Sequence, residues 1–188
     1  VENDPATLLT KRVKKHVLGT PAEKDVLVYE EPDDSFYMGV GRTRDERFIT
    51  ITVESTVSAE LRYTPASQPG AFTILAPRER DLEYTADHLD GRWVILANAN
   101  GAKNFKLVTA PTGSTSRADW KDWIAHRDDV FLERFILFDG FTAIAERSNA
   151  LSRLRIIKPG GAEEHVKADE PAYAMSLSAN PESGTDWL

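Results

Sequence analysis

The sequence contains no cysteine among its 188 residues. Disulfide bonds, a thiolate nucleophile and cysteine-ligated zinc or iron–sulfur sites are therefore excluded. Long apolar runs are also missing, since none approaches the roughly 20 residues that a membrane-spanning helix needs. The N-terminus lacks the apolar stretch of a signal peptide. These absences predict no membrane partner. The sequence pI of about 5.2 fits a cytoplasmic location, with the periplasm left open because the chain begins at Val1 rather than methionine.

Basic residues are in the minority. The chain has 23 Lys and Arg against 30 Asp and Glu, which gives a net charge of -7. Binding to a nucleic-acid backbone requires clustered Lys and Arg side chains, so the composition predicts no nucleic-acid partner. A hydrophobic content of 41% is ordinary for a globular protein and predicts a packed core.

Sequence motifs of catalytic sites are absent as well. The chain has no Gly-x-Ser-x-Gly nucleophile motif, no Walker loop, no dinucleotide fingerprint and no His-Glu-x-x-His zinc pair. The four histidines lie on four different segments, so each is interpreted as a surface or packing residue: His16, His88, His126 and His165. The sequence therefore predicts no catalytic residue, no metal site and no cofactor in this chain, and it leaves any substrate-binding residue unassigned.

What the sequence does contain is an internal repeat. Three turn signals separate pairs of strand-like runs, at Arg44–Arg47, Leu89–Arg92 and Phe138–Phe141. The apolar runs after these turns begin with aromatic residues at positions 48, 93 and 141, which are 45 and 48 residues apart. The strands that follow end at Pro65, Pro111 and Pro159, which are 46 and 48 residues apart. The period is therefore kept across two successive strands.

Each repeat also has an inner and an outer strand. More polar runs follow the prolines, at 72–75, 120–124 and 164–166, and first strands are expected at 36–41, 83–88 and 132–137. Four antiparallel strands in about 45 residues are typical of a propeller blade. A further first strand is expected at Ala172–Ser178, and Arg12–Leu18 is interpreted as the final strand of a preceding unit.

The predicted fold class is therefore all-β. We expect a partial β-propeller of about three and a half blades of four-stranded antiparallel sheets. Residues 1–188 form one segment of such a domain, with blades at roughly 36–76, 82–125 and 130–168 and partial blades at both ends. The open ends of such an arc predict that the chain associates with itself.

The stretch from His16 to Val40 is rich in carboxylates and invites interpretation as an active site. Thr20 and Glu23 around Pro21 form a capping-box pattern, which predicts a turn or two of helix. Asp33 and Asp34 follow Pro32 and precede a strand, so a turn role is favoured, and the run lacks the spacing of a calcium loop. Glu30 and Glu31 are neighbours on a strand and point to opposite faces. A pair of carboxylates from different blades, as in a propeller glycosidase, stays open as an alternative.

Two further motifs have structural interpretations. Gly39 and Gly41 form an isolated Gly-x-Gly inside a strand, which favours a bulge or a close backbone approach. Asp119-Trp120 and Asp122-Trp123 reverse the order of the WD40 dipeptide and lack its Gly-His partner, so aromatic packing on an outer strand is the better interpretation.

Several stretches resemble a known family. The segments "HVLGTPAEKDVLVYEEPDDSFY", "LEYTADH", "KNFKL", "LERFILFD" and "DEPAYAMSLSANPE" are similar to consecutive parts of the propeller in the oligopeptidase B (protease II) group. This group belongs to the prolyl oligopeptidase family of serine peptidases. The resemblance extends from about Thr7 to Leu188.

The resemblance implies a function for a longer protein. Its members combine a seven-bladed propeller with an α/β-hydrolase domain whose serine, histidine and aspartate cut short peptides, in this group after Arg or Lys. The propeller covers that site and excludes large folded proteins. The triad and the acidic residues that hold a basic side chain lie outside this chain, so only a structural role transfers, to Tyr29–Glu31 and the strand residues. The implied partners are peptide substrates and the catalytic domain.

Two other classes of function remain as alternatives. The chain could be a standalone propeller-like module that binds a protein or peptide, or an autonomous glycosidase or metalloenzyme that uses a cross-blade carboxylate cluster. What the gene encodes after Leu188 separates the first alternative from a peptidase.

Overall fold

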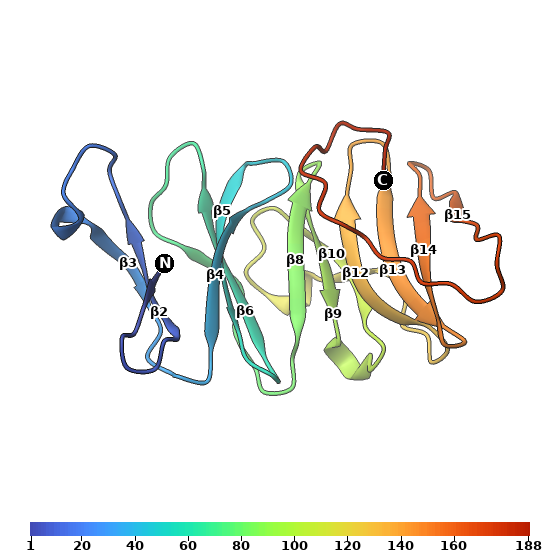
Figure 1. Cartoon of the computed structure of the whole chain (residues 1–188), viewed down its shortest axis with the longest axis horizontal. Helices are drawn as coiled ribbons and strands as arrows, with labels where there is room; N and C mark the ends of the chain where they lie inside the picture. The colour runs from blue at the N-terminus through green and yellow to red at the C-terminus, as the bar shows by residue number, and fades with distance from the viewer.

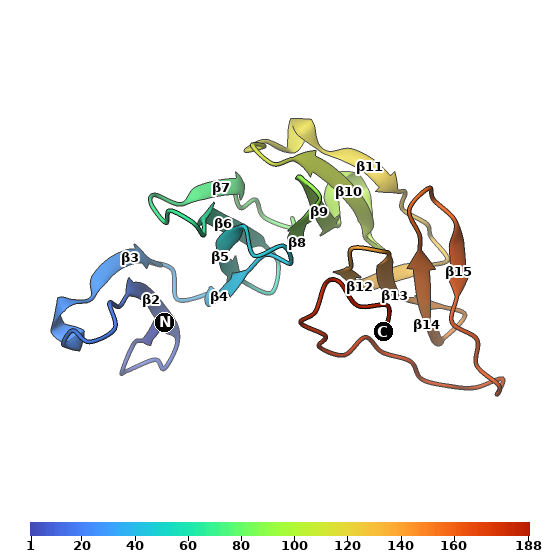
Figure 2. The same cartoon turned by 90° about the horizontal axis from the view of Figure 1, so that it is seen from above.

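The computed structural model describes all residues from Val1 to Leu188 and is built from β-strands and three short 3-10 turns. The strands form one three-stranded and three four-stranded antiparallel sheets. The sheets stand side by side along an arc (Figure 1), and the view from above shows its concave and convex sides (Figure 2). No helix is long and apolar enough to cross a membrane. The predicted all-β partial propeller is confirmed.

Each sheet is formed by strands that follow one another in the chain. The first sheet contains β1 (Glu2–Asn3), β2 (Thr10–Lys15) and β3 (Val26–Glu30). The second contains β4 (Tyr37–Arg42), β5 (Phe48–Glu54), β6 (Ala59–Pro65) and β7 (Thr73–Ala76). The third contains β8 (Tyr84–Leu89), β9 (Arg92–Ala97), β10 (Lys106–Pro111) and β11 (Lys121–Ile124). The fourth contains β12 (Phe131–Leu137), β13 (Thr142–Ser148), β14 (Leu151–Ile157) and β15 (Glu163–His165).

The predicted turns form as the sequence indicates. β8 and β9 are joined by Asp90 and Gly91, whose φ angles are 53° and 74°. A two-residue hairpin loop with two positive φ angles matches the twist of the strands that it joins, which explains the Asp-Gly sequence. The turns between β4 and β5 and between β12 and β13 also lie where the repeat predicts them.

The core consists of layers between neighbouring sheets. The largest has 14 buried residues and lies between the second and third sheets. In it the rings of Phe48, Tyr63 and Trp93 have centroids 4.9 to 5.4 Å apart. A layer of nine buried residues lies between the third and fourth sheets, and one of five between the first and second. The middle strands β9 and β10 of the third sheet are buried on both faces because the second and fourth sheets lie on either side of them.

Three predictions at the ends of the chain are wrong. Arg12–Leu18 is not the final strand of its unit, since β2 lies in the middle of the first sheet and β3 forms its outer edge. The β-branched run from Val26 is long enough to make that strand. The capping box does not form either. The Thr20 hydroxyl donates to Val17 O at 2.7 Å, and Pro21 precedes a single 3-10 turn, Ala22–Lys24.

Ala172–Ser178 does not form the predicted strand. No other segment of the chain pairs with it, so its backbone has no ladder to join. Leu177 is instead buried against an apolar layer on the fourth sheet that includes Ala145 and Leu154. The segment therefore covers this face as an irregular chain.

The segment after β15 continues across the concave side of the arc (Figure 2). The Asp139 N–H donates to Ser183 O at 2.9 Å, and Arg44 donates to Glu182 O at 2.9 Å and to Asn180 O. Arg44 lies in the turn after β4, so this segment connects the fourth sheet to the second.

Candidate functional site

The carboxylates of the His16–Val40 stretch are engaged in structural contacts. Glu31 is only 1% exposed, and its carboxylate accepts hydrogen bonds from Arg78 Nη2 at 2.6 Å and Nη1 at 3.3 Å. The Tyr29 hydroxyl and the Asp33 N–H donate to the same carboxylate at 2.6 and 3.1 Å. Burial acts to raise the pKa of Glu31, but these donors hold that pKa below its ordinary value.

Arg78 connects the first sheet to the second. It follows β7, its guanidinium lies 4.1 Å from the Phe36 ring centroid, and its Nε lies 3.6 Å from Glu60 Oε2. A planar guanidinium with several carboxylate and aromatic partners holds these groups in one arrangement. The stretch is therefore a joint between blades, in agreement with the structural role of Tyr29–Glu31.

The remaining carboxylates have the predicted local roles. Asp33 Oδ1 accepts from the Ser35 N–H at 2.9 Å, and its carbonyl accepts from Phe36 N, which closes a turn. Glu30 pairs with Arg12 at 2.9 Å on the exposed side of the strand, whereas Glu31 points into the joint. The two glutamates therefore point in different directions, as expected.

A second polar cluster lies between the second and third sheets and has the order of a catalytic triad. His88 Nδ1 lies 2.6 Å from Asp45 Oδ2, and His88 Nε2 lies 2.9 Å from Thr112 Oγ1. Aspartate, histidine and a hydroxyl in this order are the components of nucleophilic hydrolysis. No catalytic sequence motif marks the cluster, because its members come from a turn, an inner strand and a loop.

The hydrogen bonds exclude a nucleophilic role for Thr112. Its hydroxyl donates to Gly91 O at 2.5 Å, so its only proton is used and Oγ1 presents lone pairs to His88. Because that proton is committed to Gly91 O, the contact between His88 Nε2 and Thr112 Oγ1 offers no hydroxyl proton for the imidazole to remove. His88 is also 0% exposed, so no substrate reaches it. The cluster is therefore a polar joint between blades with a buried histidine.

The other three histidines have separate surroundings. His16 Nδ1 lies 2.7 Å from Asp25, and His165 Nε2 lies 2.9 Å from Glu146. His126 has only a distant contact with an aspartate, at 3.9 Å. No group of three His, Asp or Glu side chains in the structure is arranged to hold a metal ion.

Carboxylates from three sheets line one cavity of about 220 Å³, near the β5–β6 turn and the starts of β8 and β12. They are Glu54, Glu83 and Glu133. Glu83 accepts a hydrogen bond from Asn98 at 3.3 Å, and Glu133 pairs with Arg147. Two of the three are thus engaged elsewhere, whereas glycoside hydrolysis requires a cooperating pair.

The glycine and tryptophan motifs have packing roles. Gly39 lies in a regular ladder without a bulge, and a Cβ there would come within 2.9 Å of Thr52 Oγ1. The close-approach interpretation therefore holds and the bulge interpretation does not. Trp120 packs edge-on against Tyr84 at 5.6 Å, and Arg92 lies 5.2 Å from the Trp123 ring.

The joint residues that the sequence analysis missed have a common signal. Glu31 and Arg78 are 47 residues apart, and Asp45 and His88 are 43 residues apart. Both separations are close to the repeat period, because each pair joins neighbouring blades. Polar residues about one period apart could therefore have been proposed as partners.

Comparison with known proteins agrees with the architecture. The family model "Prolyl oligopeptidase, N-terminal beta-propeller domain" matches residues 2–187. The chain therefore belongs to the propeller domain of the prolyl oligopeptidase family, whose members are serine peptidases. The resemblance predicted from the sequence is confirmed.

Individual relatives make the placement more specific. The chain is 71% identical over all of its 188 residues to dipeptidyl aminopeptidase BI of Pseudoxanthomonas mexicana, of which it covers 26%. It is 26% identical over 164 residues to Protease 2 of Moraxella lacunata. This alignment covers 87% of this chain and 23% of the relative. Oligopeptidase B of Leishmania major superimposes with a TM-score of 0.80 at 29% identity, over 88% of this chain and 24% of that one. The chain thus spans about a quarter of the length of these relatives.

Proposed function

We propose that this chain is a noncatalytic propeller segment of an oligopeptidase B-like serine peptidase, and that the whole protein hydrolyses short peptides after Arg or Lys. The observation that carries the proposal is the family match over residues 2–187. The similarity to oligopeptidase B at a TM-score of 0.80 supports the assignment to an oligopeptidase B-like protein, and cleavage after Arg or Lys is what the resemblance to that group implies. The histidine of the triad-like cluster is buried and the cluster has no free nucleophile, which supports a noncatalytic role.

A second mode of cleavage is supported by a different observation. A relative that is 71% identical over the full chain is named dipeptidyl aminopeptidase BI. In this mode the whole protein removes dipeptides from a free N-terminus, whereas the first mode also accepts a blocked N-terminus.

A matched set of coumarin amide substrates separates these modes for the full-length protein. We expect cleavage of Gly-Arg-coumarin and of its acetylated form, with little cleavage of Gly-Glu-coumarin. Loss of cleavage on acetylation supports dipeptide release instead. Equal rates for Arg and Glu contradict basic specificity.

The isolated chain should be inactive. Turnover of these substrates by the isolated chain would contradict the noncatalytic role if a serine-directed inhibitor abolishes it.

The propeller is also proposed to control access to the active site. The full-length protein should cleave a flexible peptide but not the same sequence in a loop of a stably folded protein, because the folded carrier cannot pass the propeller. Cleavage of both at equal rates contradicts gating.

The alternative of a standalone binding module makes a different prediction. In that case the reading frame after Leu188 encodes no further blades and no Gly-x-Ser-x-Gly motif.

Self-association of the isolated chain is a further part of the proposal. The residues after β15 cover the face of the fourth sheet that points away from the third sheet. The other end of the arc, at the first sheet, is therefore the more open one. Six exposed large apolar side chains lie in or beside the first sheet: Val1, Leu8, Val17, Leu18, Val26 and Leu27. Exposed apolar surface of this kind favours a contact between two copies.

A further inference from the structure

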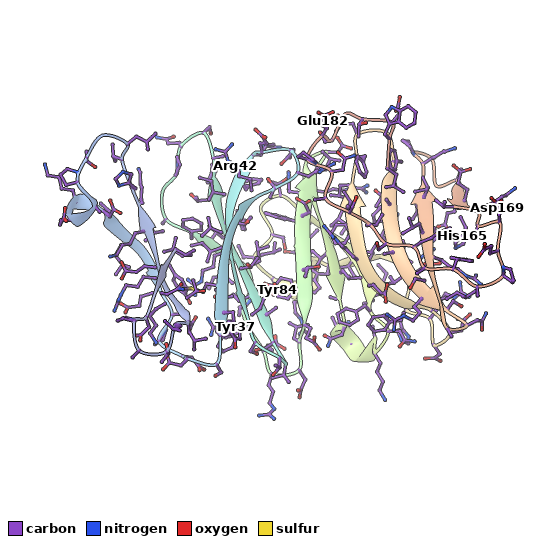
Figure 3. All side chains as sticks on the ribbon, in the orientation of Figure 1. Tyr37, Arg42, Tyr84, His165, Asp169 and Glu182 are labelled. Carbon is purple, nitrogen blue, oxygen red and sulfur yellow. The ribbon has the colours of Figure 1, made fainter.

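The innermost strand of the second sheet has an open edge. β4 pairs only with β5, and the register from Tyr37 to Arg42 has no irregularity. These two residues, labelled in Figure 3, mark the ends of the strand. Its free edge lies on the concave side of the arc, where β4, β8 and β12 are the inner strands (Figure 2).

The register shows which backbone groups are unpaired. The Thr43 N–H donates to Phe48 O at 3.0 Å, which makes these two residues a hydrogen-bonded pair. Such pairs recur at every second residue of an antiparallel ladder, so Gly41 and Gly39 also bond to β5. The N–H and C=O groups of the residues between them point away from β5. These residues are Met38, Val40 and Arg42, and none of their N–H or C=O groups has a hydrogen-bond partner within the chain.

The equivalent edges of the other inner strands are partly covered. On β8 the His88 N–H donates to Asp87 Oδ1 at 2.7 Å, and His88 O accepts from the Asp45 N–H at 3.4 Å. On β12 the Leu132 N–H donates to Asn104 O at 3.0 Å. β4 is therefore the inner strand with the longest row of free donors and acceptors.

β4 also lacks the features that normally protect an edge strand. Proteins cover such edges with proline, lysine or a bulge, and this strand has none of them. Val40 is 49% exposed, and the glycines on either side of it contribute no side chain that could cover the backbone.

We propose that the free edge of β4 binds an extended peptide segment as an additional strand, through the backbone groups of Met38, Val40 and Arg42. Binding of this kind takes its affinity from main-chain hydrogen bonds and accepts many side chains. A single extended chain fits the position better than a second copy does, because the first sheet and β8 lie on either side of β4 on the concave side (Figure 2).

The test uses this chain and two synthetic peptides, so it does not depend on peptidase activity. The first probe is acetyl-Lys-Thr-Val-Thr-Val-Thr-Lys-amide, and the second carries N-methyl groups on alternate residues. The first peptide should slow hydrogen exchange of the Met38, Val40 and Arg42 amides, as measured by NMR. The methylated peptide should bind at least about tenfold more weakly, which corresponds to about 1.4 kcal/mol, because its donors on one edge are lost.

A pair of proline variants locates the binding strand. Val40→Pro removes an N–H that has no partner in the chain, so the fold should be retained, and peptide affinity should fall at least about tenfold. Ala86→Pro is the matched control, because the ladder between Glu83 and Asn98 places the Ala86 N–H at the free edge of β8. The control should bind the peptide as the unchanged protein does. Near-ultraviolet circular dichroism checks both folds.

Several outcomes overturn the proposal. One is equal affinity for the methylated and unmethylated peptides, since that shows side-chain capture rather than strand pairing. Another is slowed exchange on β8 or β12 instead of β4. Absence of binding at millimolar peptide also overturns it. Protection of β4 that rises with protein concentration in the absence of peptide identifies a second copy as the occupant. If Val40→Pro does not fold, the comparison of the two peptides on the unchanged protein still decides.

Discussion

The joint between the first and second sheets differs from the joint between the second and third. The first has a small apolar layer of five buried residues and the charged pair of Glu31 and Arg78. The second has an apolar layer of 14 buried residues that includes Trp93. Neighbouring blades of this propeller segment can therefore be held together either mainly by a buried ion pair or mainly by apolar packing. Where the apolar layer is thin, the geometry of the charged groups matters more.

The largest expected effect comes from the apolar joint. Trp93 is 0% exposed, and its Nε1–H donates to Thr112 O at 3.1 Å. Trp93→Ala should lower the free energy of unfolding by about 3 to 5 kcal/mol, because it leaves a cavity between two sheets. Trp120→Ala is the comparison, since this side chain is only partly buried beside the same layer. Denaturant unfolding measures both, and equal shifts would show that the assigned blade positions are wrong.

The ionic joint gives the next effect. Glu31→Gln should lower the free energy of unfolding at neutral pH by about 2 kcal/mol, because the buried partner of Arg78 loses its charge. This is less than for a fully buried ion pair, since Arg78 is partly exposed and solvent screens its charge. Glu30→Gln is the control on the exposed side of the strand and should change stability little. If both variants behave alike, the buried pair does not stabilise this joint.

Acidification should remove the same contribution. The pKa of Glu31 is below its ordinary value in the folded protein, so the folded state binds fewer protons than the unfolded chain as pH falls. The stabilisation is present above the ordinary pKa of a glutamate and is lost as pH falls through the folded value. Glu31→Gln should therefore make the acid side of the stability curve less steep, and an unchanged slope contradicts the assignment.

The open end of the first sheet predicts concentration-dependent assembly. Leu27 is 50% exposed on β3, at the end of the arc with the thinner apolar layer. We expect a dimer or larger assembly in light scattering coupled to size exclusion, and dissociation on hundredfold dilution. Leu27→Lys should shift the protein toward the monomer, whereas Val57→Lys in the β5–β6 turn should not. A monomer mass at every concentration contradicts self-association.

The repeat explains why most of the fold could be predicted from the sequence. Turn residues such as Asp90 and Gly91 restrict the backbone locally, so their positions follow from the sequence alone. The end segments were mispredicted because their structure depends on what lies beside them. Ala172–Ser178 has the composition of a strand but no strand to pair with, and Thr20 uses its hydroxyl in the preceding turn.

The joints were harder to predict than the strands. Glu31 and Arg78 meet because two blades pack together, and local propensity carries no information about that contact. The triad-like arrangement around His88 arises in the same way, and only the direction of the Thr112 hydroxyl shows that it lacks a nucleophile. Sequence therefore located the carboxylate-rich stretch and its structural role, but not the residues that Glu31 contacts.

The smallest expected effect concerns a carboxylate in the apolar joint, and its sign is opposite to that of Glu31. Burial raises the pKa of Asp87, although the Arg44 and His88 N–H groups donate to Oδ1 at 2.7 Å and oppose the shift. The folded state therefore binds more protons than the unfolded chain above the ordinary pKa of 3.8, and this carboxylate makes stability fall as pH rises toward its folded pKa. Asp87→Asn keeps an acceptor for both N–H groups and removes this dependence.

The variant's stability should thus decline less between the ordinary and the raised pKa of Asp87. Asp90→Asn, in the exposed hairpin turn, is the matched control and should leave the pH profile as it is. Chemical denaturation at a series of pH values, with Glu31→Gln measured in parallel, compares the two joints directly. Slopes that change in the same direction for Glu31→Gln and Asp87→Asn contradict the distinction between the two joints. In the ionic joint the buried Glu31 carboxylate stabilises, whereas in the apolar joint the half-buried Asp87 carboxylate destabilises.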